Sequence, residues 1–147
     1  MPKFKSSKEV CSECERDGLV IRLEEVDIAK IQHMLRIAQA DLDVVKALVS
    51  ETPKDSPSWS TLYKLQYDAL HQLIDAFLRF DRIKTNNHQC LFAYLCETHP
   101  DLVLDWNFFE KVRTKRNGIQ YYGTPGLFLI GKNLKFRCAC TWIFLRS

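Results

Sequence analysis

Hydrophobic residues in the middle of the chain recur at alternating spacings of three and four. After Asp27 the recurring positions are Ile28, Ile31, Leu35, Ala38, Leu42, Val45 and Val49. This is the pattern of an amphipathic helix with one buried stripe. Asp27 is a residue type that caps helix starts. Pro53 and Pro57 are expected to end the helix, because proline lacks a backbone donor and disfavours the α conformation in the residue before it.

A second helix, predicted to run from about Ser58 to Arg82, has a wider apolar face. One line of apolar positions is Leu62, Leu65, Ala69, Leu73, Ala76 and Phe80, and a second line is Leu70, Ile74 and Phe77. Little of such a helix faces water, so we expect it to lie at the centre of the fold. Tyr67, Asp68 and His71 are the polar residues embedded in it. The simplest interpretation of His71 is a core histidine whose hydrogen bonds are satisfied.

Two further helix starts carry capping residues. Asn87 precedes a short helix that ends at His99 and Pro100, and Asp105 precedes a last helix that residues 123–126 end. Together these segments predict an all-α fold, an up-and-down bundle of four to five helices over residues 26–123.

The two ends of the chain differ from this helical middle. Residues 1–25 are predicted to form an extended arm, because residues 18–23 are short, β-branched and bounded by glycine and acids. Residues 124–147 have no helical period, and we expect an irregular or β-like tail. Its cations argue against a membrane span.

The composition favours a single soluble domain. A chain of 147 residues with 46% hydrophobic residues can build one core. The formal net charge of +3 is too small to indicate a nucleic-acid-binding protein, so a phosphate site must come from local clustering. The start of the chain lacks an apolar core of signal-peptide length, and no apolar run reaches ~18 residues. We therefore expect a cytoplasmic protein without a membrane span, and no pattern points to a cofactor.

Six cysteines without a secretory signal predict reduced thiols rather than a disulfide framework. Cys90 and Cys96 fall inside a helical pattern and are interpreted as small core residues. Cys11 and Cys14 have the spacing of half a zinc site. The second half is missing, because the close cysteine pair near the C-terminus is too narrowly spaced. The favoured interpretation is therefore a loosely packed arm without metal, and structural zinc is the alternative.

The densest positive charge lies near the end of the last helix, at Lys111, Arg113, Lys115 and Arg116. On a helix, Val112, Arg116 and Ile119 share one side, so Arg116 is expected beside the core. One interpretation is a site for phosphate or carboxylate, which the guanidinium fork matches. The other is a solvated helix end whose cations complement the helix dipole.

Three segments carry a resemblance to a known family. Residues 67–78 form an aromatic and alanine-rich helix, residues 83–88 form the turn after it, and residues 116–123 combine an Arg-Asn pair with Tyr-Tyr-Gly. In this order they resemble the central helix, the following turn and the end of the last long helix of the HEPN domain family of prokaryotic helical proteins. The likeness covers about residues 20–123.

The resemblance implies a helical bundle, usually dimeric, in which the Arg and His of an Arg-x4-6-His motif converge from two subunits to cut RNA. It also implies a small nucleotidyltransferase partner in a toxin–antitoxin pair, which modifies a tyrosine near the motif. Arg116 matches the motif arginine and Asn117 the residue after it. The histidine is absent: Tyr121 follows Arg116 after four residues, and Gln120 follows Arg113 after six. We therefore expect at best a weak ribonuclease, because neither Gln nor Tyr, with a pKa of about 10, readily accepts the proton of a 2′-hydroxyl.

Three functions remain open from the sequence. The first is a catalytically degenerate HEPN-type module, a homodimer that binds single-stranded RNA or a partner nucleotidyltransferase. Its binding residues would be Arg113, Lys115, Arg116, Asn117, Gln120, Tyr121 and Tyr122. The second is a metal-independent ribonuclease in which His71 or His88 moves the proton beside Arg116. The third is a purely structural helical interaction domain.

Overall fold

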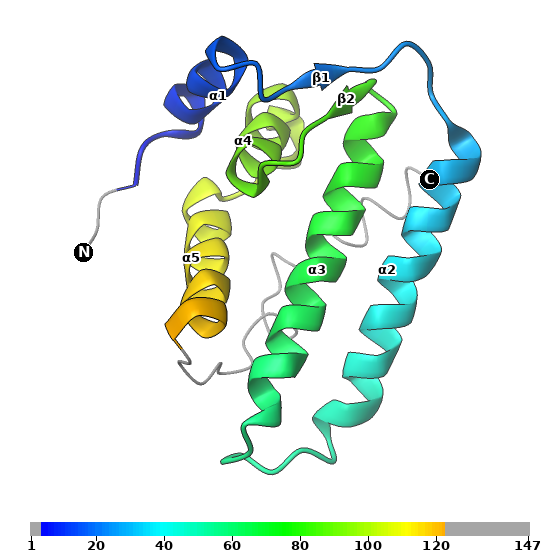
Figure 1. Cartoon of the computed structure of the whole chain (residues 1–147), viewed down its shortest axis with the longest axis vertical. Helices are drawn as coiled ribbons and strands as arrows, with labels where there is room; N and C mark the ends of the chain where they lie inside the picture. Colours follow the sequence, from blue (N-terminus) through cyan, green and yellow to red (C-terminus); the bar gives the residue numbers. More distant parts are fainter. Residues whose placement is uncertain (1–3, 123–147) are drawn as a thin grey trace.

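The computed structural model describes the backbone of residues 4–122 and the side chains of residues 4–118. Figure 1 shows α2 and α3 as a long antiparallel pair, with α5 on the other side of α3 and α1 beside α4. The elements are α1 (Ser7–Arg16), β1 (Ile21–Arg22), α2 (Ile28–Val49), α3 (Ser58–Arg79), β2 (Ile83–Lys84), α4 (His88–Thr98), a 3₁₀ turn (Pro100–Leu102) and α5 (Trp106–Tyr122). The predicted all-α bundle is confirmed for this part of the chain.

The hairpin of α2 and α3 agrees with the sequence pattern. Asp27 caps α2, and its Oδ1 accepts a hydrogen bond from the backbone N–H of Lys30 at 3.0 Å. α3 begins at Ser58 as predicted. It ends at Arg79 instead of Arg82, because Arg82 adopts a left-handed conformation (φ 61°) that turns the chain toward β2.

α3 is the central helix, as its wide apolar face predicted. Its buried residues face α2 on one side and α4 and α5 on the other. Beneath its polar residues the core is aromatic: Phe92 of α4 stacks on Phe109 of α5 with ring centroids 5.1 Å apart. The ring of Tyr67 meets the edge of Phe92 at 6.0 Å. The aromatic core therefore reaches directly under the polar side chains that α3 carries.

α4 and α5 begin at the predicted caps. The Oδ1 of Asn87 accepts a hydrogen bond from the N–H of Cys90 at 2.9 Å, and the Oδ1 of Asp105 accepts one from the N–H of Phe108 at 3.3 Å. The predicted stop at residues 123–126 and the predicted tail lie outside the described residues. Within residues 4–122, no helix is both long and apolar enough to span a bilayer.

The prediction of an extended arm over residues 1–25 is wrong for its first half, which forms α1 and packs on α4. Only Val10 and Cys14 of this helix are buried. Its apolar stripe is therefore too short for a helical period to stand out in the sequence. The second half is extended as expected, since β1 pairs antiparallel with β2 and Ile21 lies opposite Lys84.

The prediction of reduced cysteines is wrong for one pair. Cys14 of α1 and Cys90 of α4 form a disulfide with their Cα atoms 5.9 Å apart. Because the two residues are 76 positions apart, no local spacing indicates the bond. Cys11 and Cys96 are free thiols, and the interpretation of Cys11 and Cys14 as half a zinc site fails because Cys14 is bonded elsewhere. Within the described residues, no group of three or more His, Cys, Asp or Glu side chains is placed to hold a metal ion.

Candidate anion-binding site

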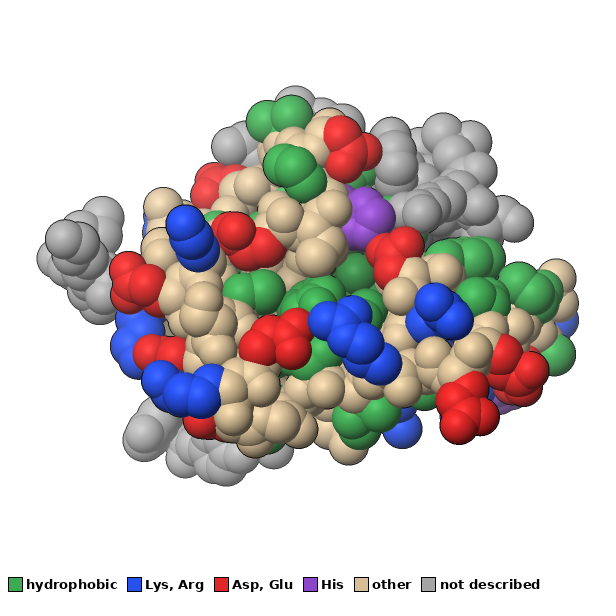
Figure 2. Space-filling view, turned by 90° about the horizontal axis from the view of Figure 1, so that it is seen from above, with side chains coloured by type: hydrophobic (Ala, Val, Ile, Leu, Met, Phe, Trp, Pro, Cys, Tyr) green, Lys and Arg blue, Asp and Glu red, His purple; other side chains and the backbone are tan. Residues whose placement is uncertain are grey.

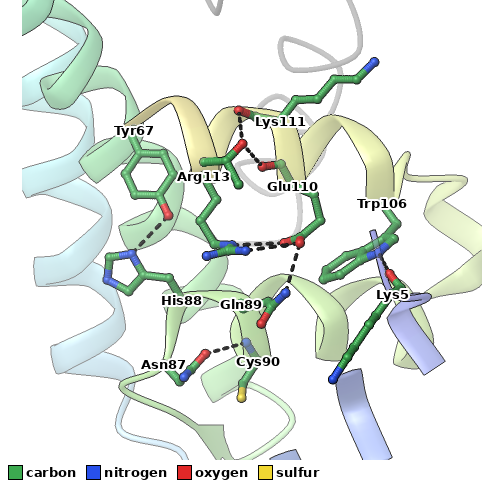
Figure 3. Close-up of polar contacts among 11 residues, drawn as sticks. Lys5, Tyr67, Asn87, His88, Gln89, Cys90, Trp106, Glu110, Lys111 and Arg113 are labelled. Carbon is green, nitrogen blue, oxygen red and sulfur yellow. Dashed lines mark hydrogen bonds and ion pairs between the residues drawn. The ribbon is translucent and has the colours of Figure 1, made fainter. Parts of the chain in front are cut away.

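Imidazole and guanidinium groups gather where α3, α4 and α5 meet. α3 supplies Tyr67 and His71, α4 begins with His88, and α5 supplies Arg113 and Arg116. We call these five side chains the imidazole–arginine cluster, and Figure 3 shows its members Tyr67, His88 and Arg113. The fold thus brings His88 near the two predicted arginines and His71 against His88.

The two imidazoles of the cluster lie against each other at a tilt. The ring centroids of His71 and His88 are 4.0 Å apart with an interplanar angle of 36°. Burial, followed by the neighbouring His88, lowers the pKa of His71 to about 3, so its imidazole is neutral at neutral pH. Its Nε2 is buried and has no hydrogen-bond partner among the described residues. The interpretation of His71 as a satisfied core histidine is therefore wrong for this nitrogen.

His88 is held by a buried phenol. The hydroxyl of Tyr67 lies 3.0 Å from the Nδ1 of His88, and Figure 3 shows it pointing at the imidazole. Burial is the main cause that lowers the pKa of His88, and Arg116 and Arg113 lower it further, while Asp68 acts in the opposite direction. Burial also raises the pKa of Tyr67, so the phenol keeps its proton. Both groups are thus uncharged.

Arg116 is desolvated and only loosely paired. Its side chain is 19% exposed, which agrees with the prediction that it lies beside the core. The guanidinium carbon lies 5.7 Å from the centroid of the Tyr67 ring, within the range of cation–π attraction. Its Nη2 is 3.6 Å from an oxygen of Asp68, a carboxylate that is half exposed. Its Nε is buried without a hydrogen-bond partner among the described residues, so this arginine has donor capacity left.

Arg113, in contrast, is fully engaged by a buried carboxylate. Its Nε and Nη2 donate to the two oxygens of Glu110 at 3.0 and 3.1 Å, and Gln89 donates to the same carboxylate at 2.9 Å, as Figure 3 shows. Glu110 is 1% exposed. This carboxylate was not predicted as part of the site, although its position three residues before Arg113 indicates a possible ion pair on a helix.

The remaining predicted residues lie along the second half of α5. The ammonium of Lys115 lies over the ring of Tyr63, 5.3 Å from its centroid, and burial lowers the pKa of Lys115. Asn117 is half-buried. Gln120, Tyr121 and Tyr122 belong to the last turns of α5, and their side chains lie outside the described part.

The charge on the rest of the molecule is mixed. Figure 2 views the protein from above and shows acidic and basic side chains interspersed over that face. A face of this kind does not attract a polyanion as a whole. This face therefore offers no broad basic surface to a polyanion.

A separate hollow of about 500 Å³ lies open between α1 and α4. Its lining consists of Lys8, Cys11, Ser12, Glu15, Tyr94, Glu97 and Thr98. Burial, together with Glu97 and Glu15, raises the pKa of Cys11 to about 11. This thiol is therefore protonated at neutral pH and is a poor nucleophile.

Comparisons with known proteins add no relative. No protein-family model matches the chain, and neither does any curated protein or solved structure. The resemblance to the HEPN family consequently rests on residues 67–78, 83–88 and 116–123.

Proposed function

We propose that the chain is a HEPN-type helical module that binds single-stranded RNA at the imidazole–arginine cluster and cleaves it weakly or not at all. The observation that supports this most directly is the state of Arg116. Its Nε is buried without a partner among the described residues, and Asp68 is 3.6 Å from its Nη2. A guanidinium in this state gains hydrogen bonds when a phosphate arrives, because phosphate offers several acceptors to the planar fork.

Two further cations of α5 add positive charge near Arg116, on another side of the helix. Lys115 is its neighbour in sequence, and Lys111 is exposed on the same helix. Such cations supply affinity without reading sequence, which is typical of proteins that track single strands. Arg113 contributes less positive charge to RNA binding, because the carboxylate of Glu110 neutralises it.

Weak cleavage is expected because the two imidazoles are weak bases. A general base works best when its pKa lies near the working pH. His71, with a pKa of about 3, holds a proton too weakly, and the pKa of His88 is lowered as well. The motif histidine of the family is absent from the sequence. These features favour a binding module over an efficient enzyme.

The ribonuclease alternative has one observation in its favour. Both imidazoles belong to the same cluster as Arg116, which is the grouping that such an enzyme would need. If the protein is a ribonuclease, RNA incubated with it should be cut, and His88→Ala should abolish the cutting. Uncut RNA in the presence of a folded, RNA-binding protein would reject this alternative.

The wider setting of the proposal comes from the resemblance. We propose a cytoplasmic homodimer that acts beside a small nucleotidyltransferase in a toxin–antitoxin pair. In the single chain, Ile37, Val44 and Leu48 are 41%, 47% and 41% exposed at spacings of seven and four along α2, which supports self-association through this helix. The mass in solution tests the dimer, and co-purification with a small nucleotidyltransferase tests the pair.

The proposed RNA site is tested by fluorescence anisotropy with a labelled, short oligouridylate. We expect Arg116→Ala to weaken binding at least about tenfold, the usual effect of losing a charged hydrogen-bonding group. The matched control is Arg36→Ala, which removes an exposed arginine of α2. Equal losses in both variants would show that only total charge matters, and the cluster would not be the site.

A further inference from the structure

We propose that Tyr67 holds His88 in one uncharged tautomer, so that the imidazole Nε2–H and the guanidinium of Arg116 together donate to a single phosphate group. The proposal deepens the function proposed above and rests on it. It assigns His88 as a phosphate donor and Tyr67 as the positioning residue behind it.

The hydroxyl of Tyr67 sets the direction of the hydrogen bond. Tyr67 is 1% exposed, and its Oη lies 3.0 Å from the Nδ1 of His88. Among the described residues this nitrogen is the hydrogen-bond partner of the hydroxyl. A buried hydroxyl without an acceptor is costly, so the hydroxyl donates its proton and the Nδ1 accepts it.

The accepting nitrogen then fixes the proton of the imidazole. A neutral imidazole carries one N–H, so acceptance at Nδ1 places the proton of His88 on Nε2. Burial opposes a second proton, and so do Arg116 and Arg113 on α5. On α3, Asp68 favours a second proton, while His71 presents another imidazole at 4.0 Å. Burial and the two arginines act together, and the uncharged form is the result.

Tyr67 contacts both donors. It bonds His88 through its hydroxyl, and Arg116 lies over its ring at 5.7 Å. Nδ1 is occupied, so Nε2 is the nitrogen that His88 can offer to a ligand. A charged fork beside an uncharged N–H suits the oxygens of one phosphate group. Because Nε2 already carries a proton, it cannot take one from a 2′-hydroxyl, so His88 assists binding and not cleavage.

The tautomer is measured directly by long-range hydrogen–nitrogen correlation NMR of the isotope-labelled protein. We expect His88 in the Nε2–H form at neutral pH. Tyr67→Phe should produce a mixture of tautomers and raise the pKa of His88, because the lost bond stabilised the neutral form. The matched control is Tyr63→Phe, since Tyr63 is equally buried and its hydroxyl donates to the carbonyl of Val112 at 3.0 Å. A wild-type His88 that is charged, or protonated on Nδ1 alone, would overturn the assignment.

The phosphate contact is measured with a short oligouridylate that lacks terminal phosphates. We expect His88→Ala to weaken its binding about tenfold. His88→Gln keeps an N–H near the position of Nε2, so its loss should stay within about threefold. Inorganic phosphate should displace the oligonucleotide, since the phosphate group itself is the ligand. If it fails to displace the strand at any concentration, phosphate is not what the cluster binds.

The outcomes separate this inference from the function on which it rests. If the wild-type protein does not bind the oligonucleotide, both fail. If binding depends on Arg116 but His88→Ala binds as well as the wild type, RNA binding stands and the role of His88 is rejected. Thermal melts of each variant confirm that the fold is intact.

Discussion

His71 and His88 come from different helices, yet their imidazoles lie in contact with centroids 4.0 Å apart and their planes tilted by 36°. Burial keeps both rings neutral by lowering their pKa values. In the unfolded chain the same imidazoles become protonated once the pH falls below 6.5, their ordinary pKa. Acid therefore favours the unfolded chain, because it binds more protons than the folded one.

This difference predicts how stability depends on pH. The contribution of His71 is fully present above pH 6.5 and is lost as the pH falls from there toward about 3. The slope from this one residue is at most about 1.4 kcal/mol per pH unit. The free energy of unfolding in urea should be measured at several pH values across this range. It should depend less on pH in His71→Leu than in the wild type, and as much as in the wild type in His33→Leu, which replaces an exposed histidine. Parallel curves for the wild type and His71→Leu would contradict the assignment.

The pair of Glu110 and Arg113 predicts a second effect on stability. Glu110→Leu leaves the guanidinium of Arg113 without its carboxylate, so we expect a loss of about 3 kcal/mol in the free energy of unfolding. Combining it with Arg113→Leu should recover part of that loss, because both charges are then removed. Glu25→Leu, at an exposed position, is the control. A double variant no more stable than Glu110→Leu would show that the pairing is not the cause.

The disulfide predicts sensitivity to reductant. Closing a loop between residues 76 positions apart is expected to stabilise the fold by about 4 kcal/mol, mainly by restricting the unfolded chain. Urea unfolding of the wild type should therefore shift on reduction to that of the Cys14→Ala, Cys90→Ala double variant. The double variant itself should not respond to reductant. Cys11→Ala removes a free thiol and should leave the shift in place.

The proposed RNA site predicts a defined dependence on salt. For a single strand, each neutralised phosphate contributes about −0.7 to the slope of log affinity against log salt concentration. Arg116→Ala should make the slope shallower by about one such contribution, whereas Arg36→Ala should not change it. Affinities titrated over a range of salt concentrations give both slopes. An unchanged slope in Arg116→Ala would place the phosphate elsewhere.

The sequence predicted those features that depend on neighbours along the chain. The caps Asp27, Asn87 and Asp105 are examples, because each bonds an amide three residues ahead. α1 escaped detection because its apolar stripe consists of two residues. Periodicity needs several turns before it exceeds chance.

The candidate site was predictable only in part. Arg113 and Arg116 stood out through local charge, and both histidines were noted, but their meeting depends on how three helices pack. The bond from Tyr67 to His88 spans 21 positions, as does the bond from Gln89 to Glu110. No local pattern encodes contacts of this kind, and the same holds for the disulfide.

The bond between Cys14 and Cys90 also has a consequence for the order of events during synthesis. Because a ribosome makes the chain from its N-terminus, α1 emerges long before α4, the helix against which it packs. The α2–α3 hairpin needs only its own segment and is complete earlier. Until α4 emerges, the apolar face of α1 has no helix to pack against, and the thiol of Cys14 lacks Cys90, with which it forms the disulfide. Formation of the disulfide therefore cannot precede the synthesis of α4, by which time α2 and α3 have already been made.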